Sequence, residues 1–211
     1  MEQRSPEWFQ ARLGKATASR FADIMATTKS GPSATRKNYL SELVLERLTH
    51  KPTESYTNQA MINGIETEPL AKLRYELATG LNVIDTGFWE HKSLLAGASP
   101  DGLIGDNGLL EIKCPIPSTH IQTLKTRKTP PKYIAQIQGQ MWITKRDWCD
   151  FVSFNSDMPV NAQLFIVRVL RDEGYIKNLE KEVRVFLDEV KEQVGFIECW
   201  ENKVGETDET L

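Results

Sequence analysis

The sequence predicts an α/β fold in which helices flank a mixed central β-sheet. Up to Gly80 the apolar residues recur at helical spacing, whereas residues 82–115 alternate as strands do. Two more β-rich runs, residues 148–154 and 162–170, follow an intervening helical pattern, as expected when distant strands share one sheet. With 211 residues and 40% apolar composition, the chain is long enough to bury one sizeable core and is predicted to form one domain over residues 1–211.

Four helical patterns are expected before the strands. The first takes Ser5 as its N-cap and Pro6 as its first residue, and Thr17 or Ser19 is positioned to cap the second. Residues 29–35 are expected to form a loop. The apolar residues of the four patterns are Trp8, Phe9 and Leu13; Phe21, Ile24 and Met25; Tyr39, Leu40, Leu43, Val44 and Leu48; and Met61, Ile65, Leu70, Leu73 and Leu77, with Gly80 ending the last helix.

Turn residues at Gly102 and at 106–108 divide the predicted strands. A short helix and a stronger one over about residues 131–144 follow a Pro-rich segment, and a long amphipathic helix begins near Asp172. Residues 205–211 are polar and acidic and are expected to fray. The buried stripe of the long helix is predicted to comprise Leu179, Val183, Phe186, Leu187, Val190 and Val194.

Composition limits the kind of metal site and the compartment. Three cysteines, Cys114, Cys149 and Cys199, are widely spaced and odd in number, which favours reduced thiols over a zinc or iron–sulfur site. The histidines share no ligand spacing, so a bound metal is expected to have oxygen ligands. No apolar run long enough for a membrane span and no secretory pattern occurs, so we expect a soluble, cytoplasmic protein.

The net charge of −3 hides an uneven distribution along the chain. Residues 112–146 contain no acid, which makes this segment a candidate phosphate track. From Asp172 onward the sequence contains twelve acidic and only five basic residues, so that region is expected to lie away from polyanions. On charge alone a solvated basic face is the more common arrangement, and the track therefore rests on the motifs below. The cations of the segment are Lys113, Lys125, Arg127, Lys128, Lys132, Lys145 and Arg146.

The segment SPDGLIGDNGLLEIKCP, residues 99–115, carries the most informative pattern. It places Asp101 near one strand and Glu111 and Lys113 on the next, with a turn at residues 106–108 that folds the two strands together. Because strand side chains alternate, Glu111 and Lys113 at spacing two point to the same face. Asp101 is expected to meet them there across the hairpin.

Two carboxylates that converge on one face are costly unless a cation binds between them, and oxygen ligands of limited charge suit Mg²⁺, with Mn²⁺ as a substitute. Lys113 is then placed to orient the attacking water or to stabilise charge on a scissile phosphate. Glu68, on the preceding helix, is available to complete a two-metal arrangement. The segment therefore favours metal-dependent phosphodiester hydrolysis.

The acidic motif by itself also fits purely structural roles. Asp101 and Gly102 are compatible with an ordinary turn, and Glu111 with Lys113 is compatible with an ion pair on a strand surface. Context favours the nuclease, since an apolar run leads into the motif, a helix with an available glutamate precedes it, and the acid-free basic segment follows.

Three motifs taken together resemble one family. With SPDG (99–102), LEIKCP (110–115) and AQIQGQMW (135–142), the chain resembles the bacteriophage lambda exonuclease and YqaJ-type viral recombinase family of the PD-(D/E)xK superfamily. The resemblance runs from about Trp8, through GIETEP (64–69), to the final helix. It implies a restriction-endonuclease-like core and 5′→3′ digestion of one strand of duplex DNA from an end, releasing mononucleotides and leaving a 3′ single-stranded tail.

The resemblance also implies roles for the acids and the lysine. Asp101 and Glu111 match side-chain ligands of Mg²⁺, with two ions expected in the site, and the Ile112 carbonyl matches a backbone ligand. Lys113 matches the lysine that assists the attacking water, and Glu68 matches an acid on the family's helix.

A second group of matches concerns the DNA end. In RLGKATAS, Arg12 and Ser19 match residues that hold a terminal 5′-phosphate, with Ser99 as a third contact, and Gln136 matches a glutamine near the catalytic centre. Without the resemblance, Arg12 fits a surface helix residue and Ser19 an N-cap. Tyr133 and Gln138 are expected to be packing or surface residues, and the expected DNA track comprises Lys125, Arg127, Lys128 and Lys132.

The partners that the resemblance implies are double-stranded DNA ends, a ring-shaped homotrimer and a single-strand annealing protein of phage-type recombination. Two other functions stay open. The same motif serves structure-specific or site-specific endonucleases, and a DNA-binding scaffold without catalysis is the rival of another class. A scaffold has no need for an acid pair beside a phosphate, which argues against it.

Overall fold

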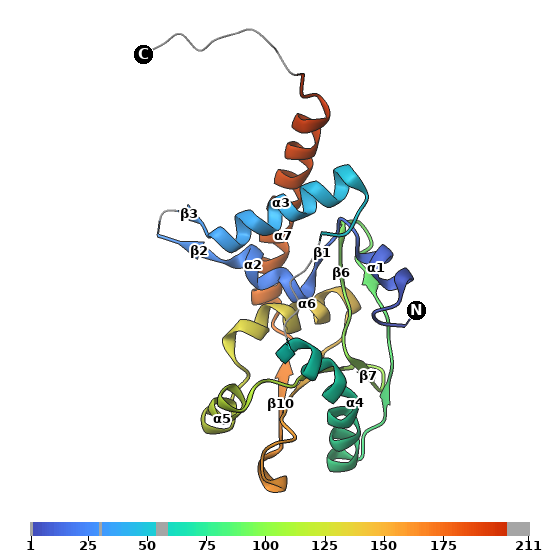
Figure 1. Cartoon of the computed structure of the whole chain (residues 1–211), viewed down its shortest axis with the longest axis vertical. Coiled ribbons are helices and arrows are strands. Elements are labelled where there is room, and N and C mark those ends of the chain that lie inside the picture. The colour runs from blue at the N-terminus through green and yellow to red at the C-terminus, as the bar shows by residue number, and fades with distance from the viewer. Residues whose placement is uncertain (1, 30, 54–58, 202–211) are drawn as a thin grey trace.

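The computed structural model describes residues 2–29, 31–53 and 59–201 (Figure 1). Its centre is a five-stranded sheet in the order β10-β9-β8-β7-β4. Strands β8 and β9 are parallel and the other neighbours antiparallel, so the sheet is mixed, as predicted. The tail expected to fray lies outside the described residues. The five strands are β4 (Val83–Ile84), β7 (Gly102–Ile104), β8 (Gly108–Lys113), β9 (Trp148–Phe154) and β10 (Leu164–Leu170).

A smaller sheet stands beside the first. In it β6 (Ala96–Ala98) pairs in parallel with β1 (Ala16–Thr17) and antiparallel with β5 (Trp89–Glu90). A two-stranded hairpin joins β2 (Thr27–Thr28) to β3 (Gly31–Pro32). The loop expected over residues 29–35 was therefore partly wrong, because it includes β3 and the start of the next helix.

Helices cover the sheet and form a layer above it (Figure 1). Ser5 caps α1 by accepting a hydrogen bond from Trp8 N at 3.2 Å, as predicted. The cap predicted at Thr17 or Ser19 was wrong: a 3₁₀ turn (η1) intervenes before α2, and the two hydroxyls lie 3.3 Å from each other. The helices are α1 (Pro6–Arg12), η1 (Ala18–Arg20), α2 (Phe21–Met25), α3 (Ala34–Thr49), α4 (Gln59–Thr79), α5 (Pro117–Thr126), η2 (Pro131–Tyr133), α6 (Ile134–Thr144), η3 (Val160–Ala162) and α7 (Glu173–Glu198).

The largest core cluster lies between α2, α3, α6 and α7. The predicted stripe of α7 lies in it, with Val194 only partly buried. Tyr39 of α3 stacks on Phe186 of α7, with ring centroids 5.4 Å apart. This layer fixes α6 over one face of the sheet, and α6 brings its glutamines to the central strand.

Helix α4 turns a different face to the sheet than its apolar stripe suggests. Ala71 and Tyr75 are fully buried, whereas Leu73 is 51% and Leu77 is 73% exposed. Periodicity shows that the leucines share a face, but the contact with the sheet uses a small residue and a tyrosine instead. Ile65 and Leu70 are exposed as well, and the Met61 side chain is outside the described residues.

A buried charge joins α4 to the neighbouring strands β9 and β10. Asp150 of β9 is 3% exposed and accepts a hydrogen bond from the Tyr75 hydroxyl at 2.7 Å. Arg168 of β10 binds both oxygens of the same carboxylate, at 2.8 and 2.9 Å. Bidentate pairing and a third donor satisfy a charge that would otherwise be costly to bury.

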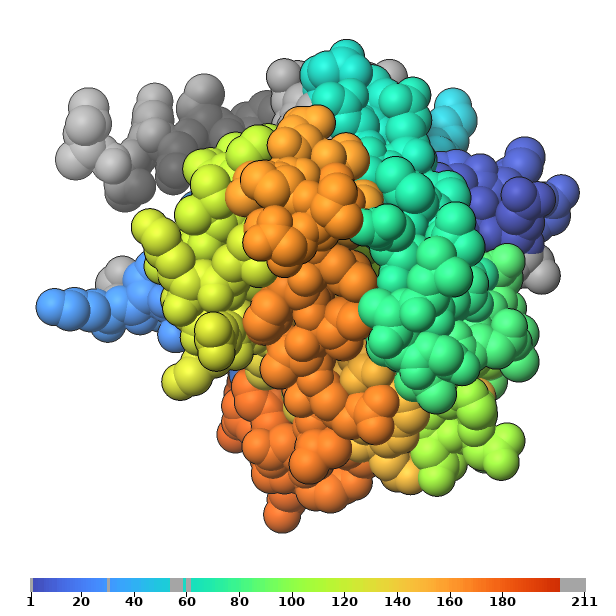
Figure 2. All heavy atoms as spheres, turned by 90° about the horizontal axis from the view of Figure 1, so that it is seen from below, coloured from blue at the N-terminus to red at the C-terminus, as the bar shows by residue number. Residues whose placement is uncertain are grey.

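On the underside of the molecule, α4, the connection between β9 and β10, and α5 lie side by side (Figure 2). Helix α1 lies on the opposite flank from α5 in this view and in Figure 1. Within the described ranges, no helix is long and apolar enough to cross a membrane.

Candidate active site

The hairpin of β7 and β8 places the predicted acids together. Gly102 pairs with Leu110, and the backbone N–H of Asp101 donates to the Leu110 carbonyl at 3.0 Å. The Asp101 carboxylate then accepts the Ile112 N–H at 2.6 Å. Gly102 was expected in a turn but begins β7, where a Cβ would lie 2.2 Å from the Val83 side chain. Asp101 is therefore held rigidly beside the strand that carries the other two residues.

Glu111 is fully buried, and three donors surround its carboxylate. Lys113 forms an ion pair with Oε1, and Gln136 Nε2 donates to the same oxygen at 2.6 Å. Gln140 Nε2 donates to Oε2, also at 2.6 Å. Bonds to both carboxylate oxygens restrict the side chain, so this arrangement holds Glu111 in a defined orientation.

Gln140 is a residue that sequence reasoning missed. Gln136 and Gln140 are one helical turn apart on α6, so the match at Gln136 together with that spacing was the signal available. Gln140 is 1% exposed, and its Oε1 is buried without a hydrogen-bond partner in the part of the chain described. Burying an unpaired amide oxygen costs stability. This cost indicates that Gln140 is placed to donate to Glu111 and not only to fill the core.

Gln138 and Tyr133 flank this pair. Gln138 donates to the Leu170 carbonyl at 2.9 Å and accepts the Asp172 N–H at 3.0 Å, which ties α6 to the start of α7. This is the packing role expected of it. Tyr133 stacks on Phe151, but its ring also lies 5.3 Å from Lys113 Nζ, so it belongs to the wall of the site.

The electrostatics of the three central residues depend on one another. Burial, followed by the charge of Glu111, raises the pKa of Asp101 well above that of an ordinary carboxyl group, although Lys113 opposes the shift. Burial alone would lower the pKa of Lys113, but the charges of Glu111 and Asp101 outweigh it and raise that pKa. Lys113 is therefore an ammonium, but its single positive charge does not balance the two carboxyl groups of Asp101 and Glu111.

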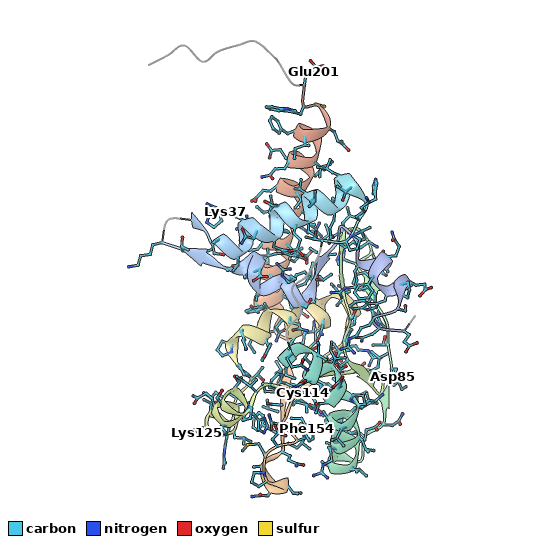
Figure 3. The ribbon with its side chains drawn as sticks, in the orientation of Figure 1. Lys37, Asp85, Cys114, Lys125, Phe154 and Glu201 are labelled. Atoms are coloured by element: carbon cyan, nitrogen blue, oxygen red, sulfur yellow. The ribbon has the colours of Figure 1, made fainter. Side chains whose placement is uncertain are left out.

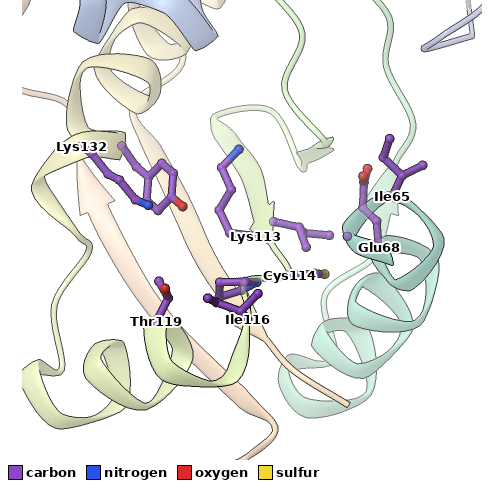
Figure 4. Close-up of a pocket in the computed structure, with 11 residues that line it drawn as sticks. Ile65, Glu68, Lys113, Cys114, Ile116, Thr119 and Lys132 are labelled. Carbon is purple, nitrogen blue, oxygen red and sulfur yellow. The ribbon is translucent and has the colours of Figure 1, made fainter. Parts of the chain in front are cut away.

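A pocket of about 490 Å³ opens beside Lys113 (Figure 4). Ile65 and Glu68 of α4 form one side of it, and Thr119 of α5 and Lys132 form the other. Glu68 pairs with Arg4 at 2.7 Å, and no hydrogen bond among the described residues joins it to Asp101 or Glu111. The pocket is large enough for part of a nucleotide.

The donor set fits a hard divalent cation. Asp101 and Glu111 offer two carboxylates, and in the described ranges no three His, Cys, Asp or Glu side chains converge. Mg²⁺ keeps several waters and is commonly bound through one or two carboxylates, so one ion fits this arrangement. Glu68 would be available to a second ion only if its pair with Arg4 opened. Cys114 does not compete, since burial raises its pKa to about 12 and keeps it a thiol.

Arg12 and Ser99 meet although 87 residues separate them. Arg12 Nη1 donates to Ser99 Oγ at 3.3 Å, and Trp8 Nε1 donates to the same oxygen at 2.9 Å. The guanidinium lies 4.0 Å from the centroid of the Trp8 ring. Burial lowers the pKa of Arg12 to about 10, and no carboxylate of the described residues forms an ion pair with it. Trp8, an apolar residue of the first predicted helix, is thus part of this cluster.

The Ser19 hydroxyl is hydrogen-bonded to that of Thr17, and among the described residues no hydrogen bond joins it to Arg12 or Ser99. Thr17 lies opposite Gly97 in a parallel register, so Ser19 and Ser99 follow the same ends of two neighbouring strands. Of the three predicted phosphate contacts, Arg12 and Ser99 meet, whereas no hydrogen bond among the described residues joins Ser19 to either of them.

The predicted DNA track is exposed along its length. Figure 3 places Lys125 on the outer side of α5 and Cys114 between α4 and α5. Arg127 ends α5 in a left-handed conformation with φ of 52°. Lys132 lines the pocket, with its ammonium 4.8 Å from the centroid of the Tyr133 ring, so the predicted track and the pocket share this residue.

Known proteins resemble this chain in sequence and in fold. The family model for the YqaJ-like viral recombinase domain matches residues 7–147. The crystal structure of an alkaline exonuclease (LHK-Exo) from Laribacter hongkongensis is 47% identical, with a TM-score of 0.86 over 92% of this chain and 96% of that one. Its complex with dAMP matches at 48% identity, with the same score and coverage.

Two more distant relatives add less. A phage related exonuclease from Haemophilus somnus 129PT shares the fold at 19% identity, with a TM-score of 0.68 over 87% of this chain and 96% of that one. The putative uncharacterized protein ExoD of Escherichia coli (strain K12) is 28% identical over 68 residues, which are 31% of this chain and 77% of ExoD.

Proposed function

Because the chain belongs to the YqaJ-like viral recombinase domain family and is nearly half identical to an alkaline exonuclease, we propose that it is a Mg²⁺-dependent 5′→3′ exonuclease of duplex DNA. It degrades one strand of a linear duplex to mononucleotides and leaves a 3′ single-stranded tail. The observation that carries this proposal is the buried Glu111, which three donors hold in one orientation beside Asp101. The adjoining pocket is lined by the cations Lys113 and Lys132.

The residues divide the reaction between them. Asp101 and Glu111 would hold the cation, together with the Ile112 carbonyl, and Mg²⁺ bound there would supply a more acidic water and charge neutralisation for the phosphate. Lys113 donates a hydrogen bond to the attacking water or to the phosphate as charge develops. Glu68, which is paired with Arg4 here, would hold a second ion only once that pair opens.

Arg12, with Ser19 and Ser99, takes the terminal 5′-phosphate. A guanidinium and hydroxyls are suited to a dianion, and Arg12 has no carboxylate partner to displace among the described residues. Water attacks the next phosphorus, and the bond from phosphorus to O3′ of the terminal nucleotide breaks. The phosphate stays on the following nucleotide, so each cycle presents a new 5′-phosphate to Arg12.

The test is digestion of linear duplex DNA labelled at either end, with Mg²⁺, Mn²⁺ or EDTA. Mononucleotides are expected only from 5′ ends, only with metal, and faster from 5′-phosphate than from 5′-hydroxyl ends. Arg12→Gln is expected to remove the preference for phosphate, a loss of about tenfold or more for a charge-assisted contact.

Closed circular duplex separates the rivals. Circles that are cut would establish an endonuclease on this fold and end the exonuclease proposal. No digestion of any substrate, with binding retained, would leave the scaffold function.

We place the enzyme in the cytoplasm of a bacterial host, working as a ring-shaped homotrimer with a single-strand annealing protein. The apolar face of α4 supports self-association. Leu73 and Leu77 are 51% and 73% exposed there, and exposed apolar surface of this kind often marks a contact with another chain. Light scattering of the native protein is expected to give three times the chain mass of 24.0 kDa. A mass of one chain at micromolar concentration would exclude the ring.

A further inference from the structure

A second hollow, of about 550 Å³, lies next to the active-site pocket. Its walls are α5 on one side and residues 128–131 on the other. Thr119 lines both hollows, and Pro131 of the second directly precedes Lys132 of the first. A strand that leaves the active site past Thr119 therefore enters this second hollow.

The walls of this α5 hollow are mainly apolar although threonines predominate. The hydroxyls of Thr123 and Thr126 donate to carbonyls of their own helix, those of Thr119 and Thr123, at 3.1 and 3.2 Å. Because these hydroxyls are hydrogen-bonded within the helix, the threonines offer the hollow their methyl groups. The rings of Pro130 and Pro131 line it as well. Such a surface suits a flat apolar group.

One polar group in the wall of the hollow lacks a partner. Thr129 Oγ1 has no hydrogen bond among the described residues, and because the atom is buried, a ligand reaches it only when the side chain rotates. Native proteins leave few buried hydroxyls unpaired, so an unpaired one in a hollow points to a ligand that bonds it. A hydroxyl both donates and accepts, and the edge of a nucleobase offers both kinds of group.

The charges around the hollow select an anionic ligand. Lys128 lines it, and Lys125, Arg127 and Lys132 are exposed nearby. The sequence from 112 to 146 contains no acid that would repel a phosphate. A flat apolar body, a polar edge and adjacent phosphates together describe a nucleotide.

The arrangement also gives the direction. Helix α1, which carries Arg12, and helix α5 lie on opposite flanks of the molecule (Figures 1 and 2). Under the proposed function, on which this inference rests, Arg12 holds the 5′ end and Lys113 the scissile phosphate. We propose that the α5 hollow binds the base of a substrate nucleotide on the 3′ side of the cleaved bond.

The experiment uses 5′-phosphorylated duplexes with a single abasic residue at successive positions from the 5′ end of the digested strand. A stacked base contributes about 1–3 kcal/mol, so the wild-type single-turnover rate is expected to fall roughly tenfold or more at one position 3′ of the cleaved bond. Gln122→Trp, a change at an exposed lining residue, fills the hollow. It is expected to slow digestion of intact DNA by a similar factor and to remove the abasic effect.

Ile121→Trp is the matched control, since Ile121 is a neighbouring, 37% exposed residue that does not line the hollow. It is expected to keep the wild-type profile. A Gln122→Trp profile that keeps the abasic penalty would overturn the inference, as would a wild type equally tolerant at all positions. Affinity for the same oligonucleotides in EDTA gives the same comparison without cleavage, so failure of the proposed function and failure of the hollow are distinguishable.

Discussion

Asp101→Asn is expected to reduce DNA digestion by roughly a thousandfold or more while the fold and DNA binding persist. The amide oxygen of asparagine still accepts the Ile112 N–H, which Asp101 binds at 2.6 Å, so the hairpin keeps its geometry. The negative charge that a cation needs is lost. Single-turnover digestion, calorimetric titration with Mn²⁺ and thermal unfolding measure the three properties separately.

Asp106→Asn is the matched control, because it makes the same chemical change in the exposed turn of the same hairpin. It is expected to digest DNA at the wild-type rate. Digestion by Asp101→Asn within tenfold of the wild type would show that Asp101 is not a metal ligand.

A smaller loss is expected from Gln140→Met, which removes the donor to Glu111 Oε2 and keeps the side-chain volume. Residues that orient a metal ligand typically contribute about 10–100-fold in metal affinity or activity. Stability is also expected to fall, because Glu111 Oε2 is left buried without a donor among the described residues, although the unpaired Oε1 of Gln140 disappears with the change. Gln138→Met is the contrast: it is expected to lower the unfolding free energy and leave Mn²⁺ affinity unchanged, since its bonds go to Leu170 and Asp172.

The largest effect on stability is expected from Arg168→Met, which leaves the Asp150 charge buried with only Tyr75 as a donor among the described residues. Removing one partner of a buried ion pair costs about 3–5 kcal/mol, and the partial exposure of Arg168 reduces this to about 2–3 kcal/mol. Methionine keeps an unbranched apolar stem above Trp148, so packing is changed little. Urea denaturation gives the free energy of unfolding.

Arg184→Met is its control, because Arg184 pairs with Glu180 one turn away on the surface of α7. That change is expected to cost only about 0.3–0.5 kcal/mol. Equal costs for the two variants would mean that Asp150 is not a charge in the folded protein.

Local rules were sufficient where neighbours in sequence are also neighbours in space. The α/β class, the mixed sheet and the α7 stripe follow from periodicity, and the structure agrees with each. The spacing of Glu111 and Lys113 put both on one face because strand side chains alternate, and the short turn before them brought Asp101 alongside. The core of the candidate site was therefore predictable from one segment of 17 residues.

Contacts between distant segments were decided by the tertiary structure alone. Periodicity grouped the leucines of α4 on one face, but Tyr75 and its bond to Asp150 determined which face meets the sheet. Gln140 and the Trp8 ring acquired their places only when α6 and α1 packed against strands far along the chain. A sequence specifies which side chains share a face, because that depends on the local backbone; what covers the face depends on segments whose approach no local pattern encodes.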